Sequence, residues 1–153
     1  FDRLDAWLVA HDFKAYDPFD GLSSPILRPL TFGNTYLRIA LQQGIRRFPL
    51  NLRPLAGIAP AHSSKGMAYL SRGYMRRHAA SGDAKWRERA EHCLRWLDEN
   101  RSEGYSGAAW GNHFDYQSRV FYLPKNVPTV SLSYALFDVT EMAAGTITER
   151  TEG

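Results

Sequence analysis

The stretch from Gly104 to Arg119 gathers the side chains of this sequence that are best suited to chemistry. Aromatic rings, a histidine, a carboxylate, carboxamides and an arginine are interleaved there with glycines. Glycine loses more backbone entropy on ordering than other residues, so this composition is costly for a mere connection between elements. Flat apolar rings beside hydrogen-bonding groups suit a sugar, which presents both kinds of surface. We therefore predict that this loop is a carbohydrate-binding site.

The residues of this loop that we predict to bind the sugar are Tyr105, Trp110, Tyr116, Gln117 and Arg119. Trp110 and Tyr116 would be the stacking platforms. A structural interpretation stays open beside this one. In it, the aromatic rings anchor a long loop to the core, and Asp115 pairs with Arg119 as a clamp.

Helices are predicted on both sides of the loop because apolar residues recur there at helical spacing. They run from Asp2 to Phe13, from Thr31 to Gly44 or Phe48, from Ser63 or Ser64 to Ser81, from Asp83 to Glu99, and from Thr129 to Gly145. The sequence predicts essentially no sheet, and β preference is high only at residues 120–122. We expect a single domain over residues 1–145 and a loose tail at 146–153.

The clearest helical pair meets at the turn Ser81-Gly82-Asp83, where Gly82 fits a left-handed helix stop and Asp83 the next N-cap. Two helices joined by so short a turn must pack antiparallel, so an α-hairpin is predicted. Gly66 and Gly73 share a side of its first helix, where another helix would approach closely. The second helix would bury an apolar stripe of Trp86, Ala90, Cys93, Leu94 and Leu97.

Two further details of the predicted helices bear on the fold. Leu4, Trp7 and Leu8 form the apolar side of the first helix. Thr31 is the predicted N-cap of the second helix.

An internal repeat relates the two halves of the chain. Trp7-Leu8 is followed by Tyr16, then by Phe19-Asp20, prolines and Thr31. The same order recurs in Trp96-Leu97, Tyr105, Phe114-Asp115, prolines and Thr129, with a longer loop. Two copies of a helix-loop-helix unit indicate an array of α/α repeats.

Four segments carry a resemblance to a known family: residues 17–22, the turn at 81–83, the loop from Trp110 to Arg119, and the Pro128-Thr129 entry. They resemble the α/α-toroid, six-hairpin glycosidase-like superfamily, particularly bacterial members associated with polysaccharide clusters. The likeness spans nearly the whole chain, and the second loop is its specific part. It implies an all-α fold of α-hairpin repeats that form part of an (α/α) toroid. Since the chain is too short for six hairpins, we expect it to be a segment of a larger toroid.

The resemblance also implies a chemistry, because loops at one mouth of such a barrel bind sugars and an aspartate often acts there as acid or base. It makes Asp115 the catalytic candidate, with His113 beside it as a proton shuttle. Glycoside cleavage normally uses two carboxyl groups, and Asp17 or Asp20 would be the second if the repeated loops share one mouth. Asp20 is also a predicted substrate-binding residue. The alternatives are aspartates that only form turns and a histidine that is only structural.

Several other kinds of site are not predicted because the sequence lacks their motifs. The five histidines lack a close paired spacing on one helix, and Cys93 has no partner cysteine, so no metal is predicted. A phosphate-binding loop, a nucleophile elbow and a dinucleotide fingerprint are all missing from the sequence, and no cofactor is predicted. Cys93 lies on the apolar stripe of its helix and is predicted to be inert core.

Composition indicates which classes of partner, and which cellular compartment, to expect for the protein. Most of the 19 basic residues are arginines, which favours acidic ligands, yet no nucleic-acid-binding signature accompanies them and nucleic acid is not predicted. No apolar run approaches the roughly 20 residues that cross a membrane, and no signal-peptide pattern is visible. The single cysteine favours a cytoplasmic location.

Two functions remain after these exclusions. The first is a carbohydrate-active protein that acts on a bacterial polysaccharide through acid-base chemistry at Asp115. The second is a non-catalytic helical-repeat module that binds a glycan or a protein on the same surface. An incomplete arc exposes apolar edges, so we expect it to self-associate or to pack on the rest of a parent chain.

Overall fold

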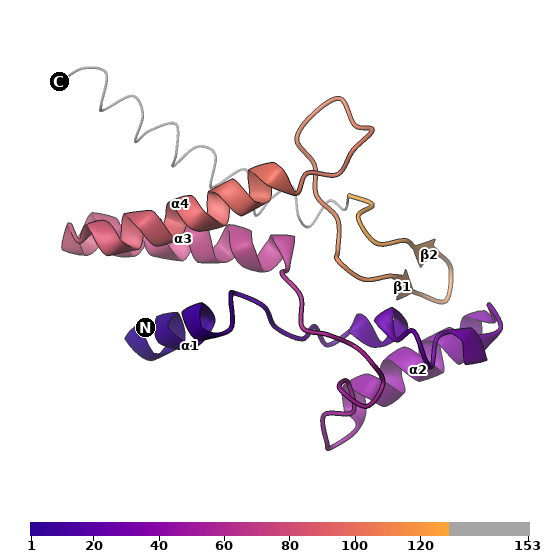
Figure 1. Cartoon of the computed structure of the whole chain (residues 1–153). Helices are drawn as coiled ribbons and strands as arrows, with labels where there is room; N and C mark the ends of the chain where they lie inside the picture. The colour runs from indigo at the N-terminus through magenta and orange to yellow at the C-terminus, as the bar shows by residue number, and fades with distance from the viewer. Residues whose placement is uncertain (129–153) are drawn as a thin grey trace. The chain divides into compact units, whose positions relative to one another are not determined.

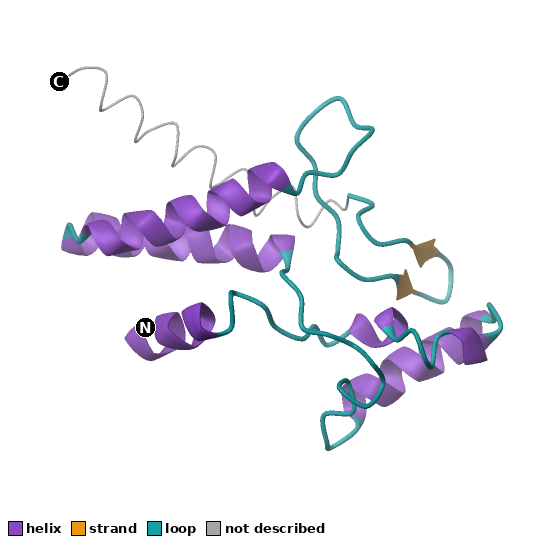
Figure 2. Cartoon of the chain, in the orientation of Figure 1, coloured by secondary structure: helices purple, strands orange, loops and turns teal. Residues whose placement is uncertain are grey.

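The computed structural model describes residues 1–128, and most of their regular structure is helical (Figures 1 and 2). This confirms the helical class predicted from the spacing. The predicted last helix and the tail lie outside the described residues. In chain order the elements are α1 (Asp2–Ala10), η1 (Asp20–Ser23), η2 (Pro29–Thr31), α2 (Thr35–Arg47), α3 (Ser64–Ser81), α4 (Ala84–Glu99), β1 (Tyr116–Gln117) and β2 (Tyr122–Leu123), where η marks a short 3-10 helix.

Contacts divide the chain into two compact units, which are described separately. The first unit comprises residues 1–62 and 112–127. The second unit comprises residues 63–111 and begins again at Pro128. None of the described helices is both long and apolar enough to cross a membrane.

The second unit is built on the α-hairpin of α3 and α4, which lie side by side (Figure 1). The hydroxyl of Ser63 caps α3 by accepting the N–H of Gly66 at 3.2 Å, and Gly82 ends it at φ 69°. Asp83 caps α4 by accepting the N–H of Lys85 at 2.9 Å. The predicted hairpin, its stop and its caps are therefore confirmed.

The core of this hairpin also follows the prediction, except that Leu94 is only half-buried. The buried side chains along the two helices include Met67, Tyr74, Trp86, Ala90, Cys93 and Leu97. The rings of Tyr74 and Trp86 stack with centroids 6.0 Å apart. The predicted close approach at the glycines is wrong for the described part of the chain, since a Cβ at Gly73 would meet nothing within 4 Å and one at Gly66 would meet only Ser63.

Helix α1 of the first unit is shorter than predicted. It ends at Ala10 because Asp12 and Phe13 take left-handed φ values of 51° and 55°, and the N–H of Phe13 turns back to the carbonyl of Leu8 at 2.8 Å. The predicted apolar side is also wrong in part. Leu8 is buried, whereas Leu4 and Trp7 are exposed.

Helix α2 begins at Thr35, and its N-cap lies three residues later than predicted. Phe32 and Gly33 are left-handed, with φ values of 48° and 75°, so the chain cannot continue as a helix from Thr31. The cap is Asn34, whose Oδ1 accepts the N–H groups of the next turn, and the Thr31 hydroxyl instead donates to the carbonyl of Arg28 at 2.7 Å. The missed signal was the asparagine that follows the glycine.

A small apolar core joins α2 to the proline-rich loop that follows it in the chain. Ile45, Ala56 and Ile58 are buried together, and the side chains packed on them are Tyr16, Leu27, Leu41 and Leu52. Helix η1 lies close against α2 at Gly21, where an added Cβ would come within 3.0 Å of the Cα of Gln42. Only glycine fits this contact without displacing backbone.

The prediction of essentially no sheet needs a correction. Strands β1 and β2 pair antiparallel as a short hairpin, with Tyr116 opposite Leu123 and Gln117 opposite Tyr122. The turn between them is held by Ser118, whose N–H donates to the carbonyl of Phe121 and whose hydroxyl accepts the Phe121 N–H, both at 2.9 Å. β2 begins within the stretch of high β preference at residues 120–122. The strands have two residues each, so the described chain stays predominantly helical.

Candidate functional site

Four of the predicted site residues belong to the β1–β2 hairpin of the first unit or lie directly beside it: Asp115, Tyr116, Gln117 and Arg119. Neighbouring residues of a strand point to opposite faces, so Tyr116 and Gln117 project from the hairpin in opposite directions. Tyr122 lies opposite Gln117 in the antiparallel register. The hairpin therefore separates an aromatic side from a hydrogen-bonded side.

Asp115 is buried and held from two directions. Its Oδ2 pairs with Nη1 of Arg28 at 2.7 Å, and its Oδ1 accepts the backbone N–H of Lys125 at 2.8 Å. The structural clamp that the sequence suggested therefore exists with a different cation. Arg119 is exposed and follows β1 at the turn, whereas Arg28 comes from the segment before η2.

Tyr122 lies beside this ion pair. Its hydroxyl accepts a hydrogen bond from Nη2 of Arg28 at 2.9 Å, and the Cζ of Arg38 lies 4.7 Å from its ring centroid. Burial raises the pKa of the Tyr122 phenol, and a hydrogen bond to Asp115 raises it further, while the charges of both arginines oppose the change. The phenol is thus kept protonated by its surroundings.

Gln117 is buried and has its polar atoms engaged within the first unit. Its N–H donates to the side-chain oxygen of Gln42 at 2.9 Å, which fixes the hairpin to α2. Its Nε2 donates to the carbonyls of Ser118 and Phe121 at 2.9 and 3.1 Å, and its Oε1 faces Nη1 of Arg38 at 3.4 Å. These contacts give Gln117 a positioning role at the turn.

The aromatic side of the hairpin joins the two loops of the internal repeat. The ring of Tyr116 meets the ring of Phe19 edge-on, with centroids 5.6 Å apart, and lies 6.4 Å from Phe121. Arg46 lies over the Phe19 ring at 4.5 Å. Phe121 is 54% exposed, so part of this surface is open to solvent.

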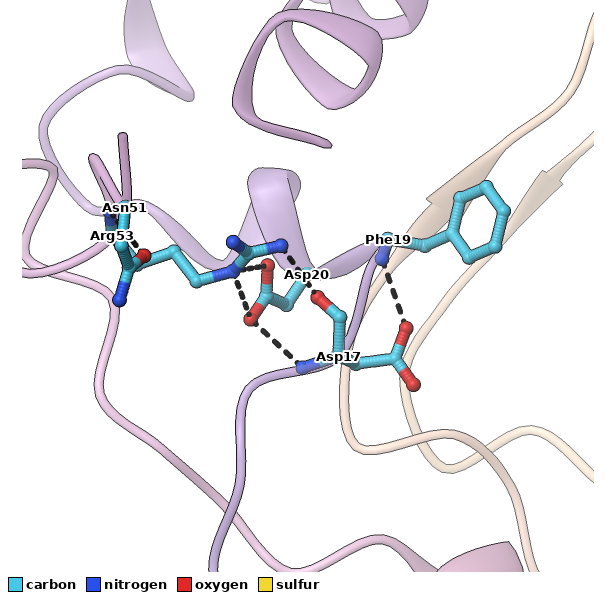
Figure 3. Close-up of polar contacts among 5 residues, drawn as sticks. All are labelled: Asp17, Phe19, Asp20, Asn51 and Arg53. Atoms are coloured by element: carbon cyan, nitrogen blue, oxygen red, sulfur yellow. Dashed lines mark hydrogen bonds and ion pairs between the residues drawn. The ribbon is translucent and has the colours of Figure 1, made fainter. Parts of the chain in front are cut away.

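Asp20 of the first repeat loop is buried against Arg53 (Figure 3). Nε of Arg53 donates to both of its oxygens, at 2.8 and 3.0 Å, and Nη2 donates to the carbonyl of Asp17 at 2.9 Å. The backbone N–H of Asp17 also donates to Asp20 at 3.1 Å. Burial raises the pKa of Asp20, and the Arg53 guanidinium opposes this. Asp20 therefore organises its own loop.

Asp17 has the turn-forming role that the sequence left open. Its Oδ1 accepts the N–H of Phe19 at 2.9 Å, two residues ahead (Figure 3). This contact sets the direction of the Phe19 backbone, whose ring meets Tyr116.

His113 lies where the repeated loops approach each other. Burial lowers the pKa of His113, while the carboxylates of Asp17 and Asp20 act to raise it and His62 to lower it further. The ring contact between Phe19 and Tyr116 shows that the second loop lies near the first within this unit. In the sequence-based prediction, Asp17 or Asp20 could join Asp115 in one site only if the two repeated loops lie close together.

Trp110 and Tyr105 belong to the second unit. The indole Nε1 of Trp110 donates to the carbonyl of Leu97 at 2.6 Å near the end of α4, which leaves the ring half-buried. Tyr105 is exposed. The predicted sugar-binding set is thus divided between the two units, and the first unit holds most of it.

Sequence reasoning missed Arg28, Arg38, Gln42, Arg53 and Tyr122. Arg28 and Tyr122 are separated by 94 residues in the chain, so no local spacing links them. The one available signal was the excess of arginine over lysine, which indicates fixed pairing with acceptors.

Among residues 1–128, no group of three or more histidines, cysteines or carboxylates is placed to hold a metal ion. Cys93 is buried in the α-hairpin, and burial raises the pKa of its thiol to about 12. Comparisons of the chain with protein-family models, with curated proteins and with solved structures found no match.

Proposed function

We propose that this chain is part of a carbohydrate-active protein and binds a bacterial polysaccharide on the aromatic side of the β1–β2 hairpin. The observation that carries the proposal is the meeting of Phe19 and Tyr116, which brings both repeated loops to one surface. Residues far apart in the chain thereby form one aromatic platform. The proposal keeps the α/α-toroid architecture as an interpretation, in which α3 and α4 are one hairpin of the array.

The chemistry of this surface suits a sugar ring. The C–H groups of a pyranose pack on aromatic faces, and its hydroxyls need hydrogen-bond partners beside them. Tyr116 and Phe121 offer the rings, and Arg46 adds a donor-rich guanidinium over Phe19. The partial exposure of Phe121 gives a ligand access to the edge of the platform.

The contacts of Asp115 favour binding over cleavage as the role of this surface. Both of its oxygens already accept from Arg28 and Lys125, so the carboxylate holds the hairpin in place. A general acid must reach the glycosidic oxygen with a proton of its own. Asp115 would have to leave these partners to do so.

Cleavage stays the second candidate because of two specific features. Tyr122 supplies a protonated phenol next to Asp115, and burial lowers the pKa of His113 against the opposing effect of Asp17 and Asp20. These groups would supply an acid and a base within one unit. An assay for reducing ends with wild type, Tyr122→Phe, His113→Gln and Asp115→Asn tests this candidate. No turnover by wild type, or turnover that survives all three substitutions, would refute it.

An array of neutral and acidic bacterial polysaccharides tests the binding proposal. Wild type should retain at least one polymer, and Phe121→Ala should weaken that binding about tenfold, equivalent to about 1.4 kcal/mol. Phe32→Ala is the matched control, since Phe32 is 86% exposed and lies in the loop before α2. Retention of no polymer, or equal losses in the two variants, would refute the assignment of this surface.

A further inference from the structure

The phenol of Tyr122 lies among three charged side chains that do not balance. Arg28 and Asp115 form an ion pair beside it, and Arg38 rests against its ring. The carboxylate of Asp115 is bound to Arg28 and to the backbone of Lys125. Around this phenol the described residues therefore supply two cations and one anion.

Arg38 is the cation without a counter-charge. No carboxylate of residues 1–128 pairs with it, and its hydrogen bond to Gln117 has an Nη1 to Oε1 distance of 3.4 Å, near the outer limit. Its Nε is buried and has no acceptor within the described chain. A half-buried guanidinium with an unused donor carries a desolvation cost, which an anion from a ligand would offset.

A carboxylate fits this position well. The guanidinium presents N–H groups in a planar fork that matches the two oxygens of a carboxylate. The Tyr122 ring fixes one face of the fork, and Gln117 constrains Nη1. Arg28 and Asp115 in turn keep Tyr122 in place, so the subsite is supported by contacts from distant parts of the first unit.

We propose that Arg38, with Tyr122 and Gln117 around it, forms an anion subsite that binds the carboxylate of a uronic acid in the polysaccharide. This inference rests on the proposed glycan function and specifies its substrate class. The carboxylate would supply Arg38 with the counter-charge that residues 1–128 lack. The acidic sugar is then recognised on the hydrogen-bonded side of the hairpin, where Gln117 and Tyr122 face each other, and neighbouring sugars of the polymer would contact the aromatic side.

NMR of the full chain, titrated with D-glucuronate and with D-glucose, tests the subsite. These sugars differ at C6, where one bears a carboxylate and the other a hydroxymethyl group. Glucuronate should shift the Arg38 Nε–H signal and the amides of Gln117 and Tyr122, while glucose leaves them in place. Arg38→Gln should weaken glucuronate binding at least tenfold, and Arg38→Lys should weaken it less because the charge remains.

Arg47→Gln is the matched control, because Arg47 is an exposed arginine in the last turn of the same helix. It should bind glucuronate as wild type does. Circular dichroism of the Arg38 variants must show the wild-type helix content, and Arg38→Lys provides the comparison if Arg38→Gln does not fold.

Four outcomes overturn the subsite. Equal shifts with glucose show that the carboxylate is irrelevant, and the same shifts with inorganic phosphate but not with glucuronate show an anion site that does not take a sugar. If glucuronate causes no shifts while the array still retains a polysaccharide, the subsite is refuted and the glycan-binding proposal stands. An array with no retained polymer removes the glycan function, and the subsite with it.

Discussion

The two units of this chain are held together in different ways. In the second unit, α3 and α4 bury apolar side chains such as Met67, Trp86 and Leu97 between capped ends. In the first unit, buried polar groups such as Asp20 and Asp115 connect loops that are distant in the chain. Apolar periodicity therefore builds the α-hairpin, whereas paired charges determine the shape of the candidate site. The units should therefore respond differently to substitution and to pH.

The largest effect on stability is expected in the second unit, whose core is apolar. Trp86→Ala removes a buried ring that stacks on Tyr74, and it should lower the free energy of unfolding by about 3 to 5 kcal/mol. Trp7→Ala is the matched control, because that indole is exposed, and it should cost less than about 1 kcal/mol. Urea unfolding followed by circular dichroism measures both. Similar costs for the two substitutions would contradict the assigned core.

In the first unit, substitution of the Asp20–Arg53 pair should reduce stability the most. Arg53→Met leaves the buried Asp20 carboxylate without its cation, so the free energy of unfolding should fall by about 3 kcal/mol. Lys14→Met breaks an ion pair that is exposed on both sides, and it should cost less than about 1 kcal/mol. Adding Asp20→Asn to Arg53→Met should restore part of the loss. No restoration would mean that the two side chains act independently.

His113 should give the first unit a pH dependence. Burial lowers the pKa of His113 in the folded chain below the ordinary value of 6.5, so the unfolded chain binds its proton first as the pH falls. The stability from neutral His113 is therefore present above pH 6.5 and is lost as the pH falls through the folded pKa. His113→Gln should flatten the slope of unfolding free energy between about pH 7.5 and 5 relative to wild type. An unchanged slope, or the same flattening in His11→Gln, would contradict this account.

The smallest effect concerns Cys93 in the apolar unit. Its thiol pKa of about 12, against an ordinary 9.0, implies roughly a thousandfold less thiolate than in the unfolded chain. A thiol reagent at pH 8 should leave the folded protein unlabelled and should react promptly after urea is added. Fast labelling of the native protein would show that the α-hairpin opens at α4.

The second unit could be predicted from sequence because its determinants are local. Gly82 ends α3, Asp83 caps α4, and the apolar stripe that begins at Trp86 follows directly. Each of these features determines structure within a few residues of its own position. Trp86, the first residue of that stripe, is buried as predicted.

The first unit was predicted less well because its determinants are distant or concern backbone conformation. The left-handed residues at Asp12 and Phe32 ended or delayed helices whose apolar spacing continued past them. The pairing of Asp115 with Arg28 in place of Arg119 depends on how the loops fold back on each other. Periodicity carries no information about such pairs, so sequence indicated the site residues in the loop but not their partners.

The most direct test of the glycan-binding account is an NMR titration of the full chain with oligosaccharides cut from a polymer that the array retains. The account predicts that the largest amide shifts fall on residues 116–122 and on the loop around Phe19. It also predicts that these shifts saturate together with one dissociation constant. Shifts confined to the exposed surface of α2 around Tyr36 and Leu37, with the hairpin unmoved, would contradict it.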